Sequence, residues 1–250
     1  MSFSALVLAG SRGGFDPLAA HAGTSDKALI EVGGSTMLAR VVAALREAGA
    51  SRVAVSASSE GVAACAAALG AEPLPAAAGP SMSVGRALDR LGAPLLVTTA
   101  DHALLRPEWV VHLLDQTPAE ADVSVLLAER AAIEAAVPAT RRTYLRFADG
   151  AWSGCNLFYL RTPSAAAAVA LWREVEADRK RPWRIVRRLG PIPLLRYALG
   201  RLTLPAALDR LGAVAGVTAR AVPSPWGLAA VDVDSPADLR LVRDLLREEA

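Results

Sequence analysis

The sequence has little of what identifies several common protein classes. It has only two cysteines, Cys65 and Cys155, and no CxxC spacing. A disulfide scaffold and a structural zinc site are therefore not indicated, and a reducing cytoplasmic location is expected. Apolar runs are short: residues 165–172 form an alanine-rich stretch, far below the ~20 residues of a transmembrane helix. The first residues lack the basic region of a signal peptide, so we expect neither a leader nor a membrane span.

An excess of charge of one sign is also missing. The 250 residues include 27 basic and 25 acidic side chains, a formal net charge of +2. Nucleic-acid binding is not expected, because such proteins normally carry a strongly basic face. Lysine is rare, since Lys27 and Lys180 are the only two. A 53% hydrophobic composition is enough for a large core, and we expect residues 1–250 to form one domain.

Short apolar runs alternate with helical patterns along most of the chain. This alternation predicts an α/β protein in which crossover helices join parallel strands. The strands are predicted at residues 5–9, 52–57, 94–99, 122–128, 156–160, 217–222 and 229–233. Helices are predicted at residues 36–48, with Ser35 as the cap and Gly49 at the end, at 107–116, at 236–248 and within 163–211. Residues 139–154 are more polar and aromatic, which predicts a hairpin or a small late insertion.

A glycine-rich loop follows the first predicted strand. The sequence there is Leu6-Val7-Leu8-Ala9-Gly10-Ser11-Arg12-Gly13-Gly14. Such a loop can present backbone N–H groups to phosphates, although GxGxxG and P-loop spacings are both absent. An ordinary strand-to-loop turn explains the loop as well as a phosphate site does.

Lys27 supports the phosphate interpretation. Lysine supplies a compact charge with three donors, which suits phosphate oxygens. A solvated surface lysine is the alternative. The position of Lys27 after the glycine-rich loop, and before a short apolar strand, favours a phosphate anchor.

Three aspartates follow the apolar runs of two predicted strands. Asp101 ends one, at the sheet edge where open α/β folds bind ligands, which makes it a natural Mg²⁺ ligand. Asp232 and Asp234 alternate on an extended segment and can therefore face the same cation. Helix capping is the alternative for all three, with Ser235 able to share that role. His102 is expected to have only a supporting role.

Four motifs in this order, LVLAGSRGG, DKALIEVGGSTML, LLVTTADHALL and VDVDSPADL, resemble the MobA-like nucleotidyltransferases. The resemblance covers both ends of the chain. It implies a three-layer, Rossmann-like (GT-A-type) fold with a mixed, mostly parallel sheet and helices on both faces. It also implies a Mg²⁺-dependent reaction in which an acceptor phosphate attacks the α-phosphorus of a nucleoside triphosphate and releases pyrophosphate.

The resemblance also implies roles for individual residues. Catalytic roles fall to Arg12, Lys27 and Asp101, and metal binding to Asp101, Asp232 and Asp234. Nucleotide binding falls to Leu8, Ala9, Gly10, Ser11, Arg12, Gly13, Lys27, Ser81, Ser83 and Ala100. Ser83-Val84 is similar to the Ser-Val of cytidylyltransferases, in which an arginine usually stands three residues earlier; Pro80 stands there in this chain. The Ser-Val pair favours CMP transfer over GMP transfer, whereas Pro80 departs from the cytidylyltransferase pattern.

The acceptor is expected beside the late insertion. The residues predicted to bind it are His102, Gly154, Asn156 and Arg179, although a simple turn before a strand also explains Gly154-Cys155-Asn156. The cationic run at residues 179–184 has three interpretations: a solvated helix face, a clamp on the acceptor phosphate, or weak contact with an anionic membrane surface.

The sequence contains no convincing Ser/His/Asp or Cys/His catalytic group. None is needed for this chemistry, because a phosphate monoester has a second pKa near ~6 and is already a dianionic nucleophile. We therefore expect residues 1–135 to bind the nucleotide and residues 136–250 to bind a small phosphorylated acceptor, such as a sugar phosphate or polyol phosphate. The alternatives are a molybdopterin-type guanylyltransferase, a GT-A glycosyltransferase and a non-catalytic nucleotide-binding module.

Overall fold

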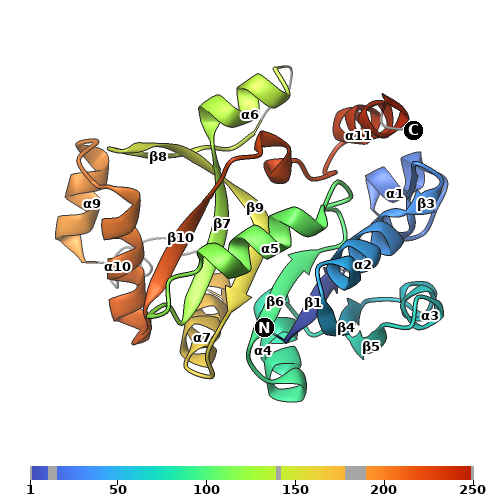
Figure 1. The fold of residues 1–250 in the computed structure, drawn as a ribbon, viewed down its shortest axis with the longest axis horizontal. Coiled ribbons are helices and arrows are strands. Elements are labelled where there is room, and N and C mark those ends of the chain that lie inside the picture. The colour runs from blue at the N-terminus through green and yellow to red at the C-terminus, as the bar shows by residue number, and fades with distance from the viewer. Residues whose placement is uncertain (1, 11–15, 139–141, 178–189, 249–250) are drawn as a thin grey trace.

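The computed structural model describes residues 2–10, 16–138, 142–177 and 190–248, and within them a central sheet flanked by helices (Figure 1). The strands are β1 Phe3–Ala9, β2 Glu31–Val32, β3 Ser35–Thr36, β4 Ala50–Ala57, β5 Glu72–Pro75, β6 Leu95–Thr99, β7 Val123–Glu129, β8 Leu145–Phe147, β9 Gly150–Leu160 and β10 Ala219–Ser224. The α-helices are α1 Pro17–His21, α2 Met37–Glu47, α3 Glu60–Ala68, α4 Pro80–Leu91, α5 Pro107–Gln116, α6 Arg130–Ala136, α7 Ala165–Ala177, α9 Pro191–Ala198, α10 Leu204–Ala215 and α11 Pro236–Glu248. Two short 3₁₀ helices are η1 Lys27–Leu29 and η2 Gly227–Ala230.

The main sheet has eight strands in the order β10-β7-β9-β6-β1-β4-β5, with β8 attached to β9. Strand β1 is parallel to β4 and β6, β4 to β5, and β7 to β10, whereas β9 is antiparallel to β6 and β7. The predicted mixed, mostly parallel sheet is thus confirmed. Strands β8 and β9 form an antiparallel hairpin, which confirms the hairpin predicted within residues 139–154.

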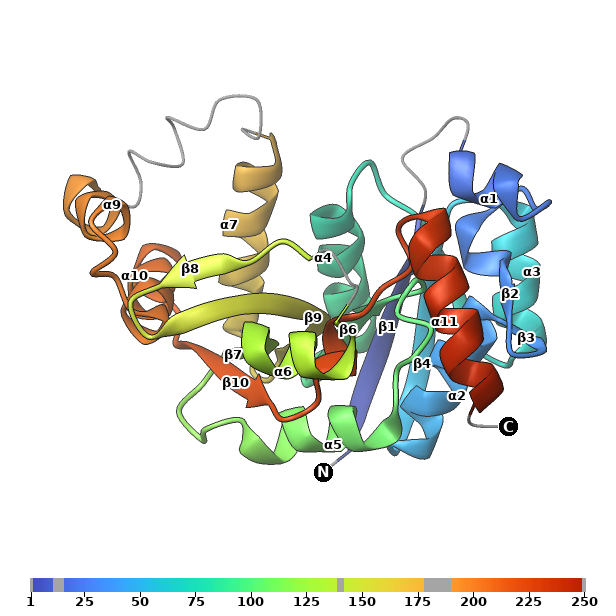
Figure 2. The ribbon, with the colours of Figure 1, turned by 90° about the horizontal axis from the view of Figure 1, so that it is seen from above.

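The sheet separates two apolar cores, because alternate side chains of a strand point to opposite faces. Ala5 and Val7 of β1 join the core formed with α2, α5 and α11, whereas Leu6 joins the core formed with α4 and α7. Figure 2 shows α2 and α5 on one side of the sheet and α4 and α7 on the other. The predicted three-layer α/β arrangement is therefore confirmed.

Three predicted helices have clear local causes. Helix α2 begins after Thr36, whose hydroxyl accepts a hydrogen bond from the Ala39 N–H at 3.1 Å. The predicted cap, Ser35, is wrong by one residue, because Ser35 pairs with Val32 in the small β2–β3 ladder. Helices α5 and α11 begin at prolines and match their predicted ranges, as expected for a residue whose φ already suits a first helical turn.

Two elements differ from expectation. Strand β5 was not predicted; it lies at the sheet edge and pairs only with β4, where its two prolines are tolerated. The strand predicted at residues 229–233 is wrong, because η2 occupies its start. Gly227 packs so tightly on α6 that a Cβ there would lie 2.1 Å from the Ala132 carbonyl oxygen. The apolar side chains that suggested a strand are buried nonetheless, Ala229 and Ala230 in η2, and Val231 and Val233 in the irregular segment that follows it.

Within the described ranges, the helices are all too short or too polar to cross a bilayer.

Candidate functional site at the carboxyl edge of the sheet

Two neighbouring parallel strands, β1 and β6, deliver the first site residues to one edge of the sheet. Strand β1 ends at Ala9 and β6 ends at Thr99, and the Ala100 N–H donates to the Leu8 carbonyl at 3.0 Å. Gly10 and Asp101 therefore emerge side by side. The chain returns to this edge more than a hundred residues later, where the Val233 N–H donates to the Asp101 carbonyl at 3.0 Å. That backbone bond brings Asp234 next to Asp101.

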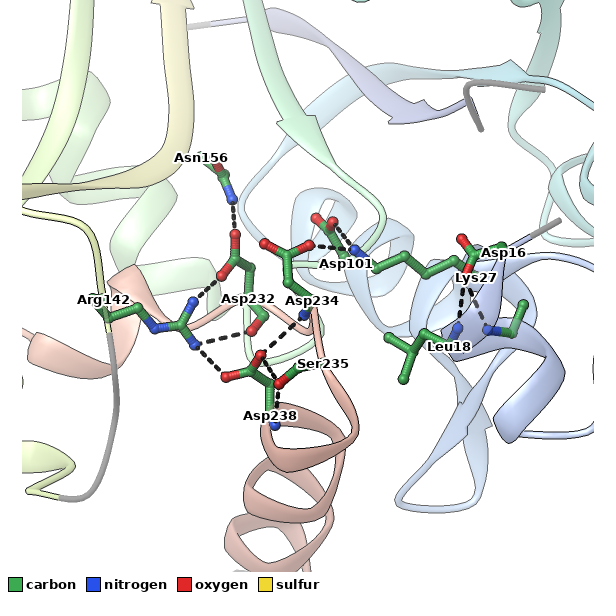
Figure 3. Close-up of polar contacts among 11 residues, drawn as sticks. Asp16, Leu18, Lys27, Asp101, Arg142, Asn156, Asp232, Asp234, Ser235 and Asp238 are labelled. Carbon is green, nitrogen blue, oxygen red and sulfur yellow. Dashed lines mark hydrogen bonds and ion pairs between the residues drawn. The ribbon is translucent and has the colours of Figure 1, made fainter. Parts of the chain in front are cut away.

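Lys27 joins the two aspartates (Figure 3). Its Nζ lies 2.6 Å from Asp101 Oδ2 and 2.6 Å from Asp234 Oδ1. We call Lys27, Asp101 and Asp234 the lysine cluster. The side chains of Lys27 and Asp101 are about one-fifth exposed, at 22% and 21%, whereas Asp234 is 65% exposed. The cluster is therefore accessible to a ligand from the side of Asp234.

Electrostatics keep the lysine charged. Partial burial opposes the ammonium form, but the charges and hydrogen bonds of Asp101 and Asp234 outweigh burial and raise the pKa of Lys27. Lys27 thus stays a cation at any physiological pH.

A small cavity of about 70 Å³ opens beside this cluster. It is lined by Leu8, Ala9, Gly10, Asp16, Asp26, Lys27, Ala28, Ala100 and Asp101. The structure therefore gathers five of the residues predicted to bind nucleotide, namely Leu8, Ala9, Gly10, Lys27 and Ala100, around one hollow. Ser11, Arg12 and Gly13 lie outside the described residues.

A second charged cluster lies beside the first. The guanidinium of Arg142 donates to two oxygens of Asp232, the side-chain Oδ1 and the backbone carbonyl, the latter at 3.0 Å. It also donates to Asp238 Oδ1 at 3.2 Å. Asn156 Nδ2 donates to Asp232 Oδ2 at 2.9 Å. We call Arg142, Asn156, Asp232 and Asp238 the arginine cluster. Figure 3 shows Arg142 and Asn156 pointing towards Asp232, and Arg142 also reaching Asp238. Both carboxylate oxygens of Asp232 are thus already engaged.

Asn156 has an unusual backbone. Its φ of 50° is positive, and it lies where the β7–β9 register shifts between Val125 and Leu127. Left-handed residues other than glycine are uncommon and are most often asparagine, aspartate or histidine. This local irregularity turns the Asn156 amide out of the strand and towards Asp232. Gly154, two residues earlier, is exposed, and no atom lies within 4 Å of where its Cβ would be.

The two clusters differ as metal sites. Within the described part of the chain, no three His, Cys, Asp or Glu side chains are grouped so that they could hold a metal ion. Asp101 and Asp234 offer two carboxylates, and the buried Asp101 Oδ1 has no hydrogen-bond partner. Oxygen donors of this kind fit Mg²⁺ or Mn²⁺, which commonly take one or two carboxylates and complete their shell with phosphate and water. Burial, with the charges of Asp234 and Asp101, raises the pKa of Asp232.

The serines predicted to contact the nucleotide lie at the start of α4. Ser81 is buried, and its N–H and hydroxyl both donate to Glu176 Oε2 near the end of α7, the N–H at 3.2 Å. The Ser83 hydroxyl accepts from the Ala77 N–H at 3.0 Å. Glu176 therefore serves as the acidic cap of α4, whose own N-cap residue, Gly79, has no side chain to do so.

His102 does not line the cavity beside the lysine cluster. Its ring is buried and stacks on Trp109, with centroids 5.7 Å apart. Burial lowers the pKa of His102 to about 4, although the nearby Asp101 carboxylate acts in the opposite direction. The imidazole is therefore neutral at physiological pH. Arg179, the last residue predicted to contact the acceptor, lies outside the described residues.

Sequence reasoning missed Arg142, Glu176 and Asp16. Arg142 and Glu176 meet their partners across about ninety residues of chain, and nothing local indicates such a contact. Asp16 had a detectable signal, since it stands directly before Pro17 and caps α1 by accepting from the Leu18 and Ala19 N–H groups.

Comparison with known proteins agrees with this architecture. The sequence model of the MobA-like NTP transferase domain matches residues 5–192. A hypothetical transferase from Thermus thermophilus is 36% identical, with a TM-score of 0.83, over 96% of this chain and 100% of that chain. No curated protein matches the chain.

Two more distant solved structures share the fold. CMP:2-keto-3-deoxy-manno-octonic acid synthetase, solved with CTP, is 18% identical with a TM-score of 0.60, over 100% of this chain and 99% of that one. Rv0371c from Mycobacterium tuberculosis H37Rv, solved with manganese, is 18% identical with a TM-score of 0.51, over 97% of each chain. The family match over three-quarters of the sequence and the 36% identical Thermus thermophilus chain show that this chain belongs to the MobA-like NTP transferase family and is a nucleotidyltransferase.

Proposed function

We propose that this protein is a Mg²⁺-dependent nucleotidylyltransferase that joins an NMP group to a small phosphorylated acceptor and releases pyrophosphate. The observation that carries the proposal is the lysine cluster, in which one cation already lies 2.6 Å from each of two carboxylates at the carboxyl edge of the sheet. Open α/β sheets bind ligands at this edge. The two carboxylates can bind a divalent cation, and the Lys27 ammonium can bind the phosphates of a triphosphate that carries that cation.

We assign the divalent cation to Asp101 and Asp234. When bound, the cation neutralises charge on the phosphates and polarises the phosphoryl group that is transferred. Asp232, predicted from the sequence as a third ligand, is assigned to positioning instead, because Arg142 and Asn156 already occupy its oxygens. The manganese bound to the distantly related Rv0371c supports a divalent cation in this family.

We assign the triphosphate to the cavity beside β1. Leu8, Ala9, Gly10 and Ala100 form its backbone wall, and the Lys27 ammonium is placed to donate to phosphate oxygens. Ser11, Arg12 and Gly13 follow Gly10 in the sequence, and we propose that they bind the phosphates too and that Arg12 adds a second cation. Ser81 and Ser83 at the start of α4 are proposed to lie near the base. CTP is the favoured donor, which the Ser83-Val84 pair and the CTP complex of a protein with this fold both support.

We assign the acceptor to the side of β9, so that residues 136–250 bind the acceptor and residues 1–135 the nucleotide. Gly154 leaves open space and Asn156 presents an amide that can donate to and accept from a hydroxyl group. Arg179 is proposed to bind the acceptor phosphate. The neutral, buried His102 contributes to packing rather than to acceptor contact.

The acceptor is proposed to be a sugar phosphate or a polyol phosphate, whose dianionic phosphate needs no base to activate it. Catalysis then rests on positioning and charge neutralisation, which Lys27 and the aspartates supply. Lys27 stays protonated and therefore has no lone pair to accept a proton, and burial with a lowered pKa makes His102 a poor base near pH 7.

Pyrophosphate release tests the proposal directly. CTP, GTP, UTP and ATP are each incubated with a panel of sugar and polyol phosphates, with Mg²⁺, with Mn²⁺ or with EDTA. We expect release with one triphosphate and one acceptor class, none in EDTA, and a loss of at least ~100-fold in Asp234→Asn. Asp209→Asn, an exposed change on α10, is the matched control and should retain full activity. Nucleotide binding without pyrophosphate release would favour a non-catalytic module, and hydrolysis of nucleotide sugars a glycosyltransferase.

A further inference from the structure

Helix α9 differs from the other long helices of the described ranges because it contributes nothing to the core. None of its residues is buried. Ile192, Leu195 and Leu199, which immediately follows the helix, are 69%, 61% and 58% exposed. Four of the eight large hydrophobic residues exposed in the described part of the chain lie between 192 and 199. Concentration of exposed apolar side chains in one short segment marks an interaction surface, whereas scattered single residues do not.

The exposed apolar residues share one side of the helix. Positions 192, 195 and 199 are three and seven residues apart, which places them on a common helical face. Tyr197 turns the other way, and its ring packs edge-on against Phe147 of β8 at 5.9 Å. Figures 1 and 2 show α9 at one end of the molecule, away from α3 and α11. The helix is therefore held on its inner side and open on its outer side.

Cations accompany this apolar face. Arg196 and Arg201 are exposed, and residues 190–201 contain no acidic residue. The sequence just before them has the same bias, with six Lys or Arg and no Asp or Glu between positions 179 and 189. We call Ile192, Leu195, Arg196, Leu199 and Arg201 the α9 surface.

We propose that the α9 surface binds an anionic lipid bilayer, with its apolar side chains among the acyl chains and its arginines at the headgroups. A helix with a strongly apolar side and basic neighbours is suited to the interface of such a membrane. Self-association through this surface is disfavoured, because a second copy would bring more arginines and no acidic residue from positions 190–201 to pair with them. Nucleic acid is disfavoured because the most exposed groups are aliphatic. The proposal does not depend on which nucleotide or acceptor the enzyme uses.

Vesicle binding by the full chain tests the proposal. Co-sedimentation is measured with vesicles of 30% phosphatidylserine in phosphatidylcholine and with pure phosphatidylcholine, at low and high salt. We expect binding to the anionic vesicles that weakens as salt is raised, because screening shortens the reach of the arginine charges. Arg196→Gln/Arg201→Gln should lower the partition coefficient about 30-fold. Ile192→Ser/Leu195→Ser should lower it at least about tenfold.

Matched control variants distinguish binding by the α9 surface from non-specific binding to vesicles. Val111→Ser/Leu211→Ser removes two exposed apolar residues elsewhere, and Arg52→Gln/Arg247→Gln removes two exposed arginines. Both control variants should bind vesicles as the parent does, and all four variants should unfold at the parent's temperature. Absence of binding to anionic vesicles would overturn the proposal, as would α9 variants that bind like the parent. A dimer of the parent chain in analytical ultracentrifugation that dissociates in Ile192→Ser/Leu195→Ser would also overturn it, because this face would then join two copies.

Discussion

The lysine cluster and the arginine cluster lie side by side and use the same two kinds of charge, yet they are built for different purposes. Lys27 presents one point charge to Asp101 and to the well-exposed Asp234. Arg142, only 9% exposed, spreads several donors over Asp232 and Asp238. A planar guanidinium holds its partners in a fixed geometry, whereas an ammonium is easily exchanged for another cation or turned towards a phosphate. The first cluster can therefore open for a ligand, and the second fixes the loop that carries Asp234.

Removing a carboxylate from the lysine cluster should have the largest effect. Asp101→Asn should reduce pyrophosphate release by about 10²–10³-fold, because the divalent cation that binds the triphosphate loses one of its two proposed carboxylate ligands. The free energy of unfolding should change little, since Lys27 keeps its ion pair with Asp234. Steady-state rates and urea unfolding are measured on the same preparation, with Asp209→Asn as the control. Activity within tenfold of the parent would show that Asp101 does not hold the cation.

Breaking the arginine cluster should reverse this pattern. Arg142→Met removes the cation that Asp232 and Asp238 share in a largely buried setting and leaves them only their neutral hydrogen-bond donors. We expect a loss of about 3 kcal/mol in the free energy of unfolding. Lys27→Met should lose less than half as much, because Asp234 remains solvated. Urea unfolding measures both variants. The control, Arg247→Met, breaks an exposed pair with Asp244 and should stay within about 0.5 kcal/mol of the parent. Equal losses for Arg142→Met and Lys27→Met would remove the distinction between the clusters.

The buried His102 gives the core next to the lysine cluster its own pH dependence. Its pKa is about 4 in the folded chain and near 6.5 when unfolded, so the unfolded state binds more protons between these values. Its contribution is fully present above pH 6.5 and is lost as the pH falls, by about 3 kcal/mol at pH 4.

The measurement is urea unfolding from pH 4 to 7, without divalent cation, for the parent and for His102→Gln. The glutamine variant does not titrate, so the difference between the two stability curves should change by this amount over the range. A constant difference would mean that His102 is solvated in the folded protein.

Alkylation of Cys155 should be very slow in the parent protein, so a faster rate in a variant reports on loosening of the structure around it. Burial raises the pKa of its thiol to about 12, and the side chain is almost wholly enclosed. In a Cys65→Ser background, iodoacetamide at pH 8 should label the native protein far more slowly than the urea-unfolded protein. Adding Arg142→Met should speed labelling, because Asp232, which anchors Asn156 next to Cys155 on β9, then loses the guanidinium that holds it in place. An unchanged rate would show that the arginine cluster does not hold β9.

Much of the fold could be predicted because its signals are local. The apolar runs of β1 and β6, and the prolines that begin α5 and α11, act within a few residues of chain. Strand β5 escaped prediction because an edge position tolerates prolines that a central strand would exclude. The false strand at residues 229–233 has the same kind of cause, since burial of an apolar run does not reveal whether its backbone pairs with a sheet or turns over a helix.

The candidate site shows the same difference between residues with a local sequence signal and residues placed by distant contacts. Lys27 and Asp101 were identifiable because each follows a strand or glycine loop whose position in an α/β sheet is known in advance. The separation of Asp232 from Asp234 was not identifiable. Alternation along an extended segment predicts that both carboxylates face one cation, but Arg142, ninety residues away, takes one of them. Such a partner is chosen by tertiary packing, which a spacing rule does not contain.

The backbone bond from Val233 to Asp101 has a consequence for the order in which the protein becomes competent during synthesis. Lys27 and Asp101 can meet once the first half of the chain has left the ribosome, but Asp234 arrives only with the segment that leads into α11. A nascent chain therefore holds only two of the three residues of the lysine cluster until the segment that carries Asp234 has been made. We therefore expect the proposed cation site to be completed in one step, when α11 packs beside β2.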